Sequence, residues 1–550
     1  MTDKTSNTLL DQPKNRNSAS GKKKTGATAE TMAGKQRDIS ISEFFAKNRH
    51  LLGFDNPKKA LLTTIKEAVD NALDACEEAH ILPEIYISIK QITENKYQVV
   101  IRDNGPGIVK RQVPNIFARL LYGSKFHSLK MSRGQQGIGI SAAGMYGLIT
   151  TGEPVEVVSR TSSKHHGYYC KLKIDTAKNR PVIVEEGQEE DFPHSTGTAV
   201  TIILEGRYNK GKQSVDEYIV QTAMANPHAI ITYDSPDGEH YEYQRQSSEM
   251  PFIPIEIKPH PYGVEVGMLY QMAQDSKTKK LPEFLNKEFS RVSVNLAKKI
   301  TKDAGLSLSL KPSKASLPEI DQLHKVVNET KIMAPSTSCI GPIGEERLEE
   351  GIRRVVEADF YATCTRRPSV YRGNPFLVEA ALAYGFQNGS DKENRDDDTK
   401  QLMQLKRIAN RVPLLYQQSA GAIHKAVLDI NWRNYALSQS KGALPAGPLI
   451  LMVHVASVWV PFTSESKEAI AHYPEIIKEI KLAVQECGRK LGVYLRRQKK
   501  IKQELAKRSY IKTYLPHIGD ALKDILELSE PQTEDVIAKL ADTLERSRKF

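Results

Sequence analysis

The stretch that decides the fold is Ser132-Arg133-Gly134-Gln135-Gln136-Gly137-Ile138-Gly139-Ile140, a glycine-rich loop that leads into a helix-forming run. Two shorter motifs precede it in the chain, Glu67-Ala68-Val69-Asp70-Asn71 and Asp103-Asn104-Gly105-Pro106-Gly107. Together they supply a carboxylate that could act as a general base, an amide that could bind a metal, an acidic side chain that could contact a nucleobase, and a loop that could hold phosphates. Each motif alone is common, but the three in this order predict a nucleotide site.

The first motif carries the residue types that nucleotide hydrolysis needs. A carboxylate one hydrogen bond from a water can polarise and aim it, and Glu67 is the candidate; the alternative is an ordinary solvent-facing helix glutamate. Asn71 follows one helical turn later and offers an amide oxygen to Mg²⁺, which takes few protein ligands and completes its shell with phosphates and water. We expect the nearby Asp70 and Asp74 to serve in positioning or capping.

The second and third motifs predict the two ends of the nucleotide. Asp103 could accept a hydrogen bond from an exocyclic amine and so select adenine over guanine; the alternative is a turn aspartate, which is common before Asn-Gly. Gly105 and Gly107 allow positive φ and a close backbone approach. Backbone N–H groups of the glycine loop and the following helix N-terminus can hold phosphates. The loop candidates are Gly134, Gln135, Gln136, Gly137, Ile138 and Gly139.

The stretch 108–133 between these motifs is flanked by glycines and polar at its end, as a lid over the nucleotide would be. Ser124 and Lys125 at that polar end are further binding candidates. Two other glycine patterns are discounted. A dinucleotide-binding fingerprint must follow a strand, whereas Gly137-Ile138-Gly139-x-x-Ala142 follows a polar loop. Gly206 to Gln213 resembles a P-loop but carries glutamine where that loop needs a metal-binding Ser or Thr.

Composition restricts the class of protein. With 550 residues, roughly two to four domains are expected, and 39% hydrophobic residues can fill their cores. The net charge of +12 is compatible with nucleic-acid binding without requiring it. Five scattered cysteines argue against a zinc site or disulfides and for a reducing interior. Without an apolar run near the ~20 residues of a membrane span or a signal-peptide core, we expect no membrane contact and a cytoplasmic location.

Periodicity indicates an α+β fold. Apolar residues at spacings of three and four predict a helix over 60–79, and Glu67 and Asn71 share a face beside its buried stripe. Alternating or apolar runs predict strands at 85–89, 97–101, 155–159, 168–174, 198–204 and 448–456. The strands and helices lack the alternation of a parallel doubly wound sheet, so we expect an α+β sandwich with largely antiparallel strands.

The three motifs resemble the nucleotide site of the GHKL ATPases, which include gyrase-type subunits, heat-shock-90 chaperones, MutL-type repair proteins and sensor histidine kinases. Longer motifs are similar to the B subunits of DNA topoisomerase VI, and this resemblance covers roughly 40–515. They are Arg49-His50-Leu51-Leu52-Gly53-Phe54, His260-Pro261-Tyr262-Gly263-Val264-Glu265, Pro368-Ser369-Val370-Tyr371-Arg372-Gly373-Asn374-Pro375 and Ala409-Asn410-Arg411-Val412-Pro413-Leu414-Leu415-Tyr416.

Composition at the two ends of the chain and the resemblance over 40–515 together imply five segments. A flexible basic arm is expected at 1–36, a GHKL (Bergerat) ATPase sandwich at 37–258, a small helix-two-turns-helix insert at 259–338, a ribosomal-S5-like transducer with a long C-terminal helix at 339–504, and a helical tail at 505–550. The helical tail is expected to pause at Pro516 and Pro531. It carries an apolar stripe that could dock a partner subunit in a groove; the alternative is that the stripe is simply core.

The resemblance also implies the function, that of the ATP-hydrolysing subunit of a type IIB topoisomerase. ATP binding closes two such subunits into a clamp on duplex DNA, and a separate A subunit cleaves both strands so that a second duplex passes in relaxation or decatenation. The complex is an A2B2 heterotetramer associated with the nucleoid. By the same resemblance Glu67 is the base, Asn71 the Mg²⁺ ligand and Asp103 the adenine contact, supported through a water by Thr198; Lys467 is the switch lysine that reaches the γ-phosphate.

Sequence-independent DNA contacts are expected from three basic clusters, 277–280, 298–302 and 496–500. A different class remains open, namely a MutL-like or chaperone-like binding switch whose ATP cycle recruits partners without strand passage. The motifs at 368–375 and 409–416 favour the topoisomerase. A histidine kinase is rejected, because His50 lies too close before Glu67 to stand on a separate dimerisation helix.

Overall fold

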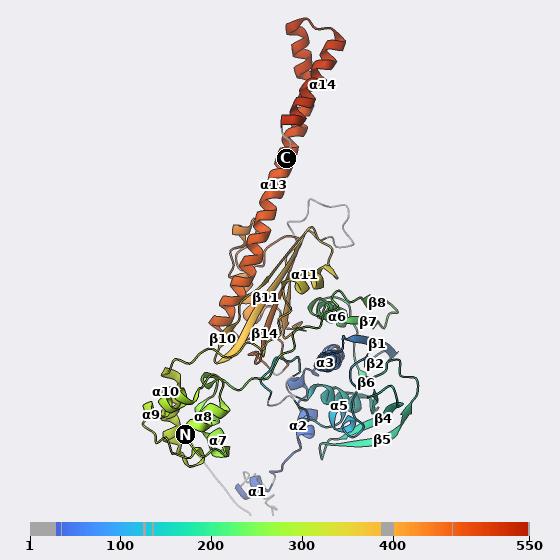
Figure 1. Cartoon of the computed structure of the whole chain (residues 1–550). Helices are drawn as coiled ribbons and strands as arrows, with labels where there is room; N and C mark the ends of the chain where they lie inside the picture. The colour runs from blue at the N-terminus through green and yellow to red at the C-terminus, as the bar shows by residue number, and fades with distance from the viewer. Residues whose placement is uncertain are drawn as a thin grey trace, which may run out of the picture.

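The computed structural model describes residues 29–34, 36–124, 128–134, 137–386, 401–464 and 466–547. Two β-sheets, each covered by helices, form the body of the molecule, a small helical unit lies beside them, and one long helix rises away from the body (Figure 1). This is the expected α+β class. All five cysteines are free and buried, and no described helix has the length and apolar character needed to span a membrane.

The first sheet has eight strands in the order β5-β4-β3-β6-β2-β1-β7-β8. All neighbours are antiparallel except β1 and β7, and the strands predicted between 85 and 204 are confirmed. The bounds are β1 Glu84–Thr93, β2 Lys96–Asp103, β3 Val155–Arg160, β4 Gly167–Asp175, β5 Arg180–Glu189, β6 Gly197–Glu205, β7 Ile230–Asp234 and β8 His240–Tyr243.

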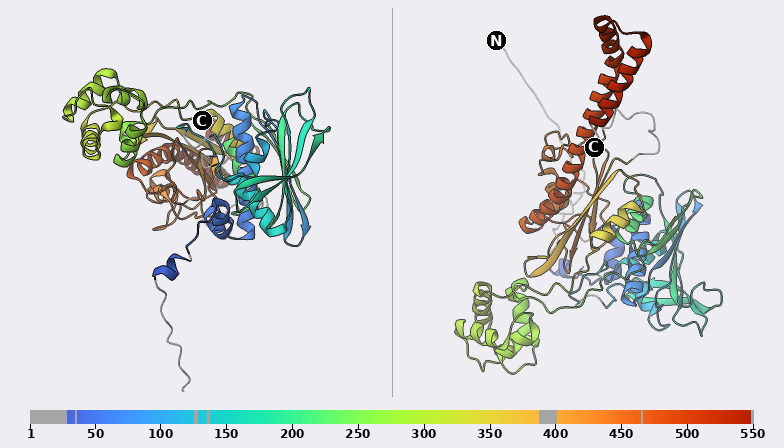
Figure 2. Two further views of the ribbon diagram at one scale, coloured as in Figure 1. Left: turned by 90° about the horizontal axis from the view of Figure 1, so that it is seen from below. Right: turned by 45° about the horizontal axis from the view of Figure 1, so that its top comes forward.

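Helix α3 (Pro57–Glu78) confirms the helix predicted at 60–79. It begins where the Asn56 side chain accepts a hydrogen bond from Lys59 N at 2.9 Å, with Pro57 in the first turn. With α5 (Gly139–Thr151) and α6 (Val215–Ala225) it covers the face of the first sheet that is turned toward the second sheet (Figure 2). The shorter helices here are α1 Ala29–Ala33, α2 Ile41–Lys47, η1 Arg49–Leu52 and α4 Val113–Phe117.

In the chain, a helical unit separates the strands of the first sheet from those of the second, and this unit has its own apolar core. Pro282, Pro312 and Pro318 each stand in the first turn of a helix, where a missing N–H costs nothing, so these prolines begin the short helices that they punctuate. The bounds are η2 Pro261–Gly263, α7 Val266–Asp275, α8 Leu281–Glu288, α9 Val294–Asp303, η3 Pro312–Lys314 and α10 Leu317–Glu329.

The second sheet has the order β10-β11-β14-β12-β13, with β9 also paired to β11. Both of its faces are covered, by α11 (Glu345–Arg353) on one side and by α12 (Ala422–Leu428) and α13 on the other. All residues of β14 are therefore buried, which explains the uninterrupted apolar run predicted as a strand. The bounds are β9 Phe360–Thr365, β10 Ser369–Tyr371, β11 Asn374–Tyr384, β12 Gln404–Ala409, β13 Val412–Pro413, β14 Leu449–Ser457 and the short helix η5 Trp432–Tyr435.

Helix α13 (Pro474–Leu526) is longer than expected. It crosses the expected boundary at 504–505 without interruption, and it also passes through Pro516, where a pause was expected. Because this part of the helix extends away from the body (Figure 1), the carbonyl that loses its partner at the proline can bind water. The chain turns at Glu527, which has a φ of 53°, and α14 (Glu530–Ser547) folds back along α13.

Candidate functional site: a nucleotide cavity between the two sheets

A cavity of about 700 Å³ lies between α3, the glycine loop and two loops of the second sheet. The second sheet contributes the segments 413–416 and 466–468 to its wall. Gly105 is not among the lining residues, and Lys125, Gln135 and Gln136 lie outside the described residues. The other candidates from the sequence line this one space: Glu67, Asn71, Asp103, Gly107, Ser124, Gly134, Gly137, Ile138, Gly139, Thr198 and Lys467.

Glu67 is held directly against the N-terminus of α5. A Cβ placed on Gly139, the first residue of that helix, would lie 1.8 Å from Glu67 Oε2, so only a glycine leaves room for the carboxylate here. The other carboxylate oxygen, Oε1, lies 3.5 Å from Lys66 Nζ. The carboxylate thus stands at the point where backbone N–H groups of α5 are free to bind an anion.

Asn71 lies one turn further along α3 and faces the start of the glycine loop. Its side chain is exposed toward the cavity, and a Cβ on Gly134 would lie 3.4 Å from Asn71 Oδ1. An uncharged amide oxygen beside a phosphate cradle is a donor of the kind that Mg²⁺ accepts when the nucleotide supplies further oxygens. The residues present therefore fit a magnesium-bound nucleotide.

The opposite end of the cavity is built around Asp103 at the end of β2. Its Oδ1 accepts hydrogen bonds from Gly105 N at 2.8 Å and Thr198 N at 3.2 Å. Burial raises the pKa of Asp103 to about 6, although these two backbone bonds act in the opposite direction. Gly105 thus serves the site by positioning the carboxylate. Gly107 has a φ of 71°, and a Cβ there would lie 2.1 Å from the carbonyl oxygen of Arg160.

Lys467 reaches the cavity from the second sheet. It adopts a φ of 53°, and its Nζ donates a hydrogen bond to the carbonyl of Arg133 at 3.3 Å. Burial lowers the pKa of Lys467, and the Glu67 carboxylate partly opposes that shift. A lysine cation and the candidate base therefore share one desolvated space, although their positions in the sequence are far apart.

Sequence reasoning missed a second link between α3 and the loop that carries Lys467. Lys59 Nζ lies 3.0 Å from Asp55 Oδ1 and 2.6 Å from Glu468 Oε1, and 5.3 Å from the ring centre of Tyr416. Glu468 also accepts a hydrogen bond from Gln417 Nε2 at 2.6 Å. The position of Glu468 directly after Lys467 was the available signal for this contact.

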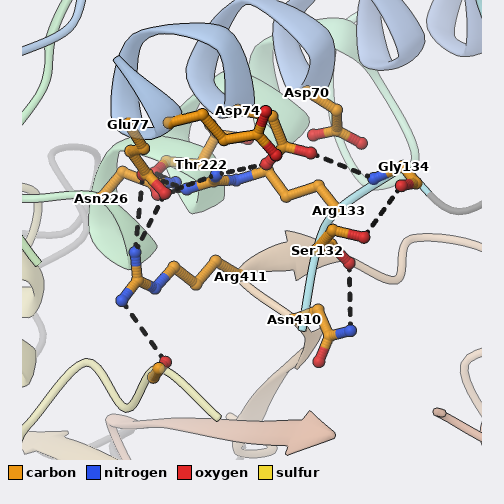
Figure 3. A network of polar contacts seen from close by, with 12 residues as sticks. Asp70, Asp74, Glu77, Ser132, Arg133, Gly134, Thr222, Asn226, Asn410 and Arg411 are labelled. Atoms are coloured by element: carbon orange, nitrogen blue, oxygen red, sulfur yellow. Dashed lines mark hydrogen bonds and ion pairs between the residues drawn. The ribbon is translucent and has the colours of Figure 1, made fainter. Parts of the chain in front are cut away.

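A buried polar network lies beneath the glycine loop (Figure 3). Arg133 donates to Asp74 at 2.8 Å, to Glu77 at 2.6 Å and to Asn226 at 2.5 Å. Burial alone would raise the pKa of Glu77, but Arg133 and Arg411 hold it well below its usual range. The loop is therefore fixed to α3 by charged contacts, and Asp74, which does not line the cavity, positions it.

Comparison with known proteins places this geometry in a family. The family described as "Topoisomerase VI B subunit, transducer" matches residues 335–507, and that described as "Histidine kinase-, DNA gyrase B-, and HSP90-like ATPase" matches residues 56–205. Among solved structures, the 43K ATPase domain of Thermus thermophilus gyrase B in complex with an aminocoumarin is similar at 11% identity with a TM-score of 0.39, over 84% of this chain and 92% of that one.

Relatives named as the B subunit of type 2 DNA topoisomerase 6 are similar over almost the whole chain. That of Methanococcoides burtonii is 46% identical over 94% of this chain and 82% of its own length. The relative from Archaeoglobus fulgidus is 43% identical over 94% of this chain and 84% of its own length. The relative from Pyrococcus horikoshii is 35% identical over 92% of this chain and 94% of its own length. The chain therefore belongs to the family of type 2 DNA topoisomerase 6 B subunits, and its place in a type IIB topoisomerase is that of the ATPase subunit.

Proposed function

We propose that the cavity binds ATP with Mg²⁺ and that Glu67 is the general base of its hydrolysis. The observation that carries the proposal is the convergence of Glu67, Asp103 and the glycine loop of the first sheet with Lys467 of the second sheet on one cavity. A carboxylate held at a helix N-terminus can orient water toward a phosphate bound by the same N–H groups. Bound ATP would thus contact both sheets at once.

Each end of the nucleotide has a partner in this arrangement. Asp103 accepts a hydrogen bond from the adenine amine, and Thr198, whose N–H already donates to Asp103, supports the same edge through a water. Gly134, Gly137, Ile138 and Gly139 present the phosphate cradle, and Ser124 lines the same cavity. Asn71 would hold Mg²⁺, which neutralises phosphate charge when it is bound.

Lys467 connects the nucleotide to the second sheet. Its ammonium group is hydrogen-bonded to the Arg133 carbonyl at the start of the glycine loop. A γ-phosphate is a stronger partner than a carbonyl, because the contact then joins two full charges in a desolvated site. ATP binding would therefore draw the loop carrying Lys467 toward the phosphates and change the angle between the sheets. We propose that this movement closes two copies of the chain into a dimer.

The closed dimer acts on duplex DNA with a cleaving A subunit in an A2B2 complex. The basic clusters at 277–280, 298–302 and 496–500 include exposed lysines and arginines that can neutralise phosphates without reading bases. Helix α13 and α14 extend beyond the body (Figure 1) and offer a surface that the A subunit can reach. Cleavage by that subunit and closure by this one together give relaxation and decatenation.

Affinity capture from an extract of the source cells tests the assembly. We expect the full chain to retain a subunit that carries a DNA-cleaving tyrosine and a Toprim metal site, and the captured complex to relax supercoiled DNA only with ATP. A chain ending at Leu505 should lose that subunit, whereas a control ending at Glu527 keeps α13 whole and removes only α14. Capture of repair or chaperone proteins in place of a cleaving subunit would contradict the proposal.

A further inference from the structure

The turn between β12 and β13 reaches from the second sheet to the glycine loop. Asn410 Nδ2 donates to the carbonyl of Ser132 at 3.1 Å (Figure 3), while its Oδ1 accepts from Ser457 N at 2.9 Å within the second sheet. The adjacent carbonyl, that of Arg133, is the one that accepts from Lys467. Two consecutive carbonyls at the start of the loop are thus bound by two separate loops of the second sheet.

Arg411, the second residue of this turn, crosses to α3. Its Nη1 lies 3.5 Å from Glu77 Oε1 and 3.4 Å from Oε2, whereas Arg133 contacts Glu77 at 2.6 Å. Charge-assisted hydrogen bonds are ordinarily about 2.7–2.9 Å long, so the contact that crosses between the sheets has room to shorten. His228 Nε2 also lies 2.9 Å from Glu77 Oε1. Arg133 and His228, on the same side as Glu77, therefore hold it closely, whereas Arg411 of the second sheet lies farther from it.

The backbone of Arg411 is fixed in the second sheet. Its N–H donates to His454 Nε2 at 3.0 Å, and His454 Nδ1 lies 2.8 Å from Glu379. Burial would raise the pKa of Glu379, but His454 and the backbone N–H groups of Ile343 and Gly344 lower it. The φ values of Asn410 and Arg411, 48° and 65°, are left-handed. These contacts hold the backbone of a strained turn in place, and from that backbone both side chains reach the first sheet and its loop.

We propose that Asn410 and Arg411 are positioning residues through which the second sheet holds the glycine loop independently of Lys467, and that the Arg411–Glu77 contact shortens when nucleotide closes the two sheets. The proposal rests on the proposed ATP-driven closure. Lys467 alone fixes a distance between the loop and the sheet, whereas the further contacts of Asn410 with Ser132 and of Arg411 with Glu77 also fix the angle between them. Nucleotide binding at the loop is then transmitted to the second sheet as a rotation of a defined direction.

Arg411→Gln tests the proposal. The variant removes the guanidinium, which also donates to the carbonyls of Gly341 and Pro342 at 3.4 and 3.2 Å, while Glu77 keeps Arg133 and His228. We expect affinity for the non-hydrolysable analogue β,γ-imido-ATP to stay within about twofold, and analogue-driven association of two chains to weaken by about tenfold, the equivalent of one charged hydrogen bond. Arg411→Lys, which keeps the charge without the fork, should recover part of the loss.

The matched control is Lys406→Gln. Lys406 lies on β12, just before this turn, and its Nζ pairs with Glu217 of α6 at 2.5 Å. It therefore also joins the second sheet to the first but does not touch the glycine loop. Association of this variant should stay within about twofold of the wild-type value. A second variant, Asn410→Asp, keeps the acceptor for Ser457 N and sets an oxygen against the carbonyls of Ser132 and Ser457, to both of which Asn410 Nδ2 donates. We expect it to impair association as Arg411→Gln does.

Ultracentrifugation of the full chains with and without the analogue gives the association constants, and thermal melting reports folding. Wild-type chains that bind the analogue but do not associate would contradict the proposed function. Wild-type association matched by both Arg411→Gln and Asn410→Asp would overturn the inference alone. If Arg411→Gln does not fold, the association constants of Asn410→Asp and Lys406→Gln are compared. Wild-type association in both of these variants would overturn the inference.

Discussion

Gly139 and Glu67 are in such close contact that a methyl group on Gly139 would overlap the carboxylate, 1.8 Å from Oε2. The first residue of α5 thus sets where the proposed base can stand. Gly139→Ala should displace the carboxylate, because the end of a flexible side chain can move where backbone cannot. We expect ATP hydrolysis to fall about tenfold or more, since small displacements of a catalytic group are costly, while ATP affinity changes by less than about threefold.

Steady-state hydrolysis and equilibrium binding measured on the same preparation separate these two effects. Gly267→Ala is the matched control, because Gly267 lies in α7 with open space around its Cβ position. That variant should hydrolyse ATP at the wild-type rate. Normal turnover in Gly139→Ala would show that the Glu67 carboxylate does not act from this position.

The pH dependence of ATP binding tests Asp103. Its pKa of about 6 is raised by burial above the ordinary value of 3.8, so its contribution to folding stability is complete below pH 3.8 and is lost as the pH rises through about 6. The ionised carboxylate is the better acceptor for adenine, so ATP affinity should rise over the same interval. Asp103→Asn keeps an Oδ1 acceptor for Gly105 and Thr198 but presents a donor to the adenine amine.

For Asp103→Asn we expect roughly tenfold weaker ATP binding at pH 7.5, the cost of one mismatched buried hydrogen bond. Calorimetric titrations at pH 5.5 and pH 7.5 compare the two chains, and the protonation of ATP itself cancels in that comparison because it affects both. The wild-type chain should gain affinity with pH relative to the variant. Identical pH profiles would remove Asp103 from the adenine contact.

Lys467→Met removes the buried cation and keeps a side chain of similar length. We expect β,γ-imido-ATP to bind within about fivefold of the wild-type affinity, because the glycine loop and Asp103 remain. Association of two chains and hydrolysis should fall by about tenfold or more, since no cation then joins the second sheet to the γ-phosphate. Lys539→Met, an exposed position on α14, is the control. Wild-type association in Lys467→Met would place the coupling elsewhere.

Features of the fold and the site were predictable where residues close together in the sequence create them. Helix α3 was predictable because its apolar stripe repeats every three or four residues, and the Glu67–Asn71 pair followed from that period. The network of Arg133, Glu77 and Arg411 was not, because three separate elements create it only on folding. Lys467 had no local signal beyond a resemblance, and Pro516 gave a wrong signal because an exposed helix tolerates it.

DNA binding should depend steeply on salt and weakly on sequence. Neutralising Lys298, Lys299 and Lys302 together by glutamine removes three exposed cations from the helical unit. For each of these that contacts a phosphate, the slope of log affinity against log salt concentration should fall by about 0.9. Fluorescence anisotropy with two unrelated duplexes measures both properties, with Lys539→Gln as the control. An unchanged slope would exclude this cluster from the DNA interface.

The most direct test of ATP-driven closure by this site is the sedimentation of Glu67→Ala with Mg-ATP. Without the base the chain should bind ATP, lose hydrolysis by a factor of about a hundred or more, and remain a dimer for as long as ATP is present. The wild-type chain under the same conditions should return to monomers as its ATP is consumed. Turnover at the wild-type rate in Glu67→Ala, or a variant that binds ATP and stays monomeric, would contradict the assignment.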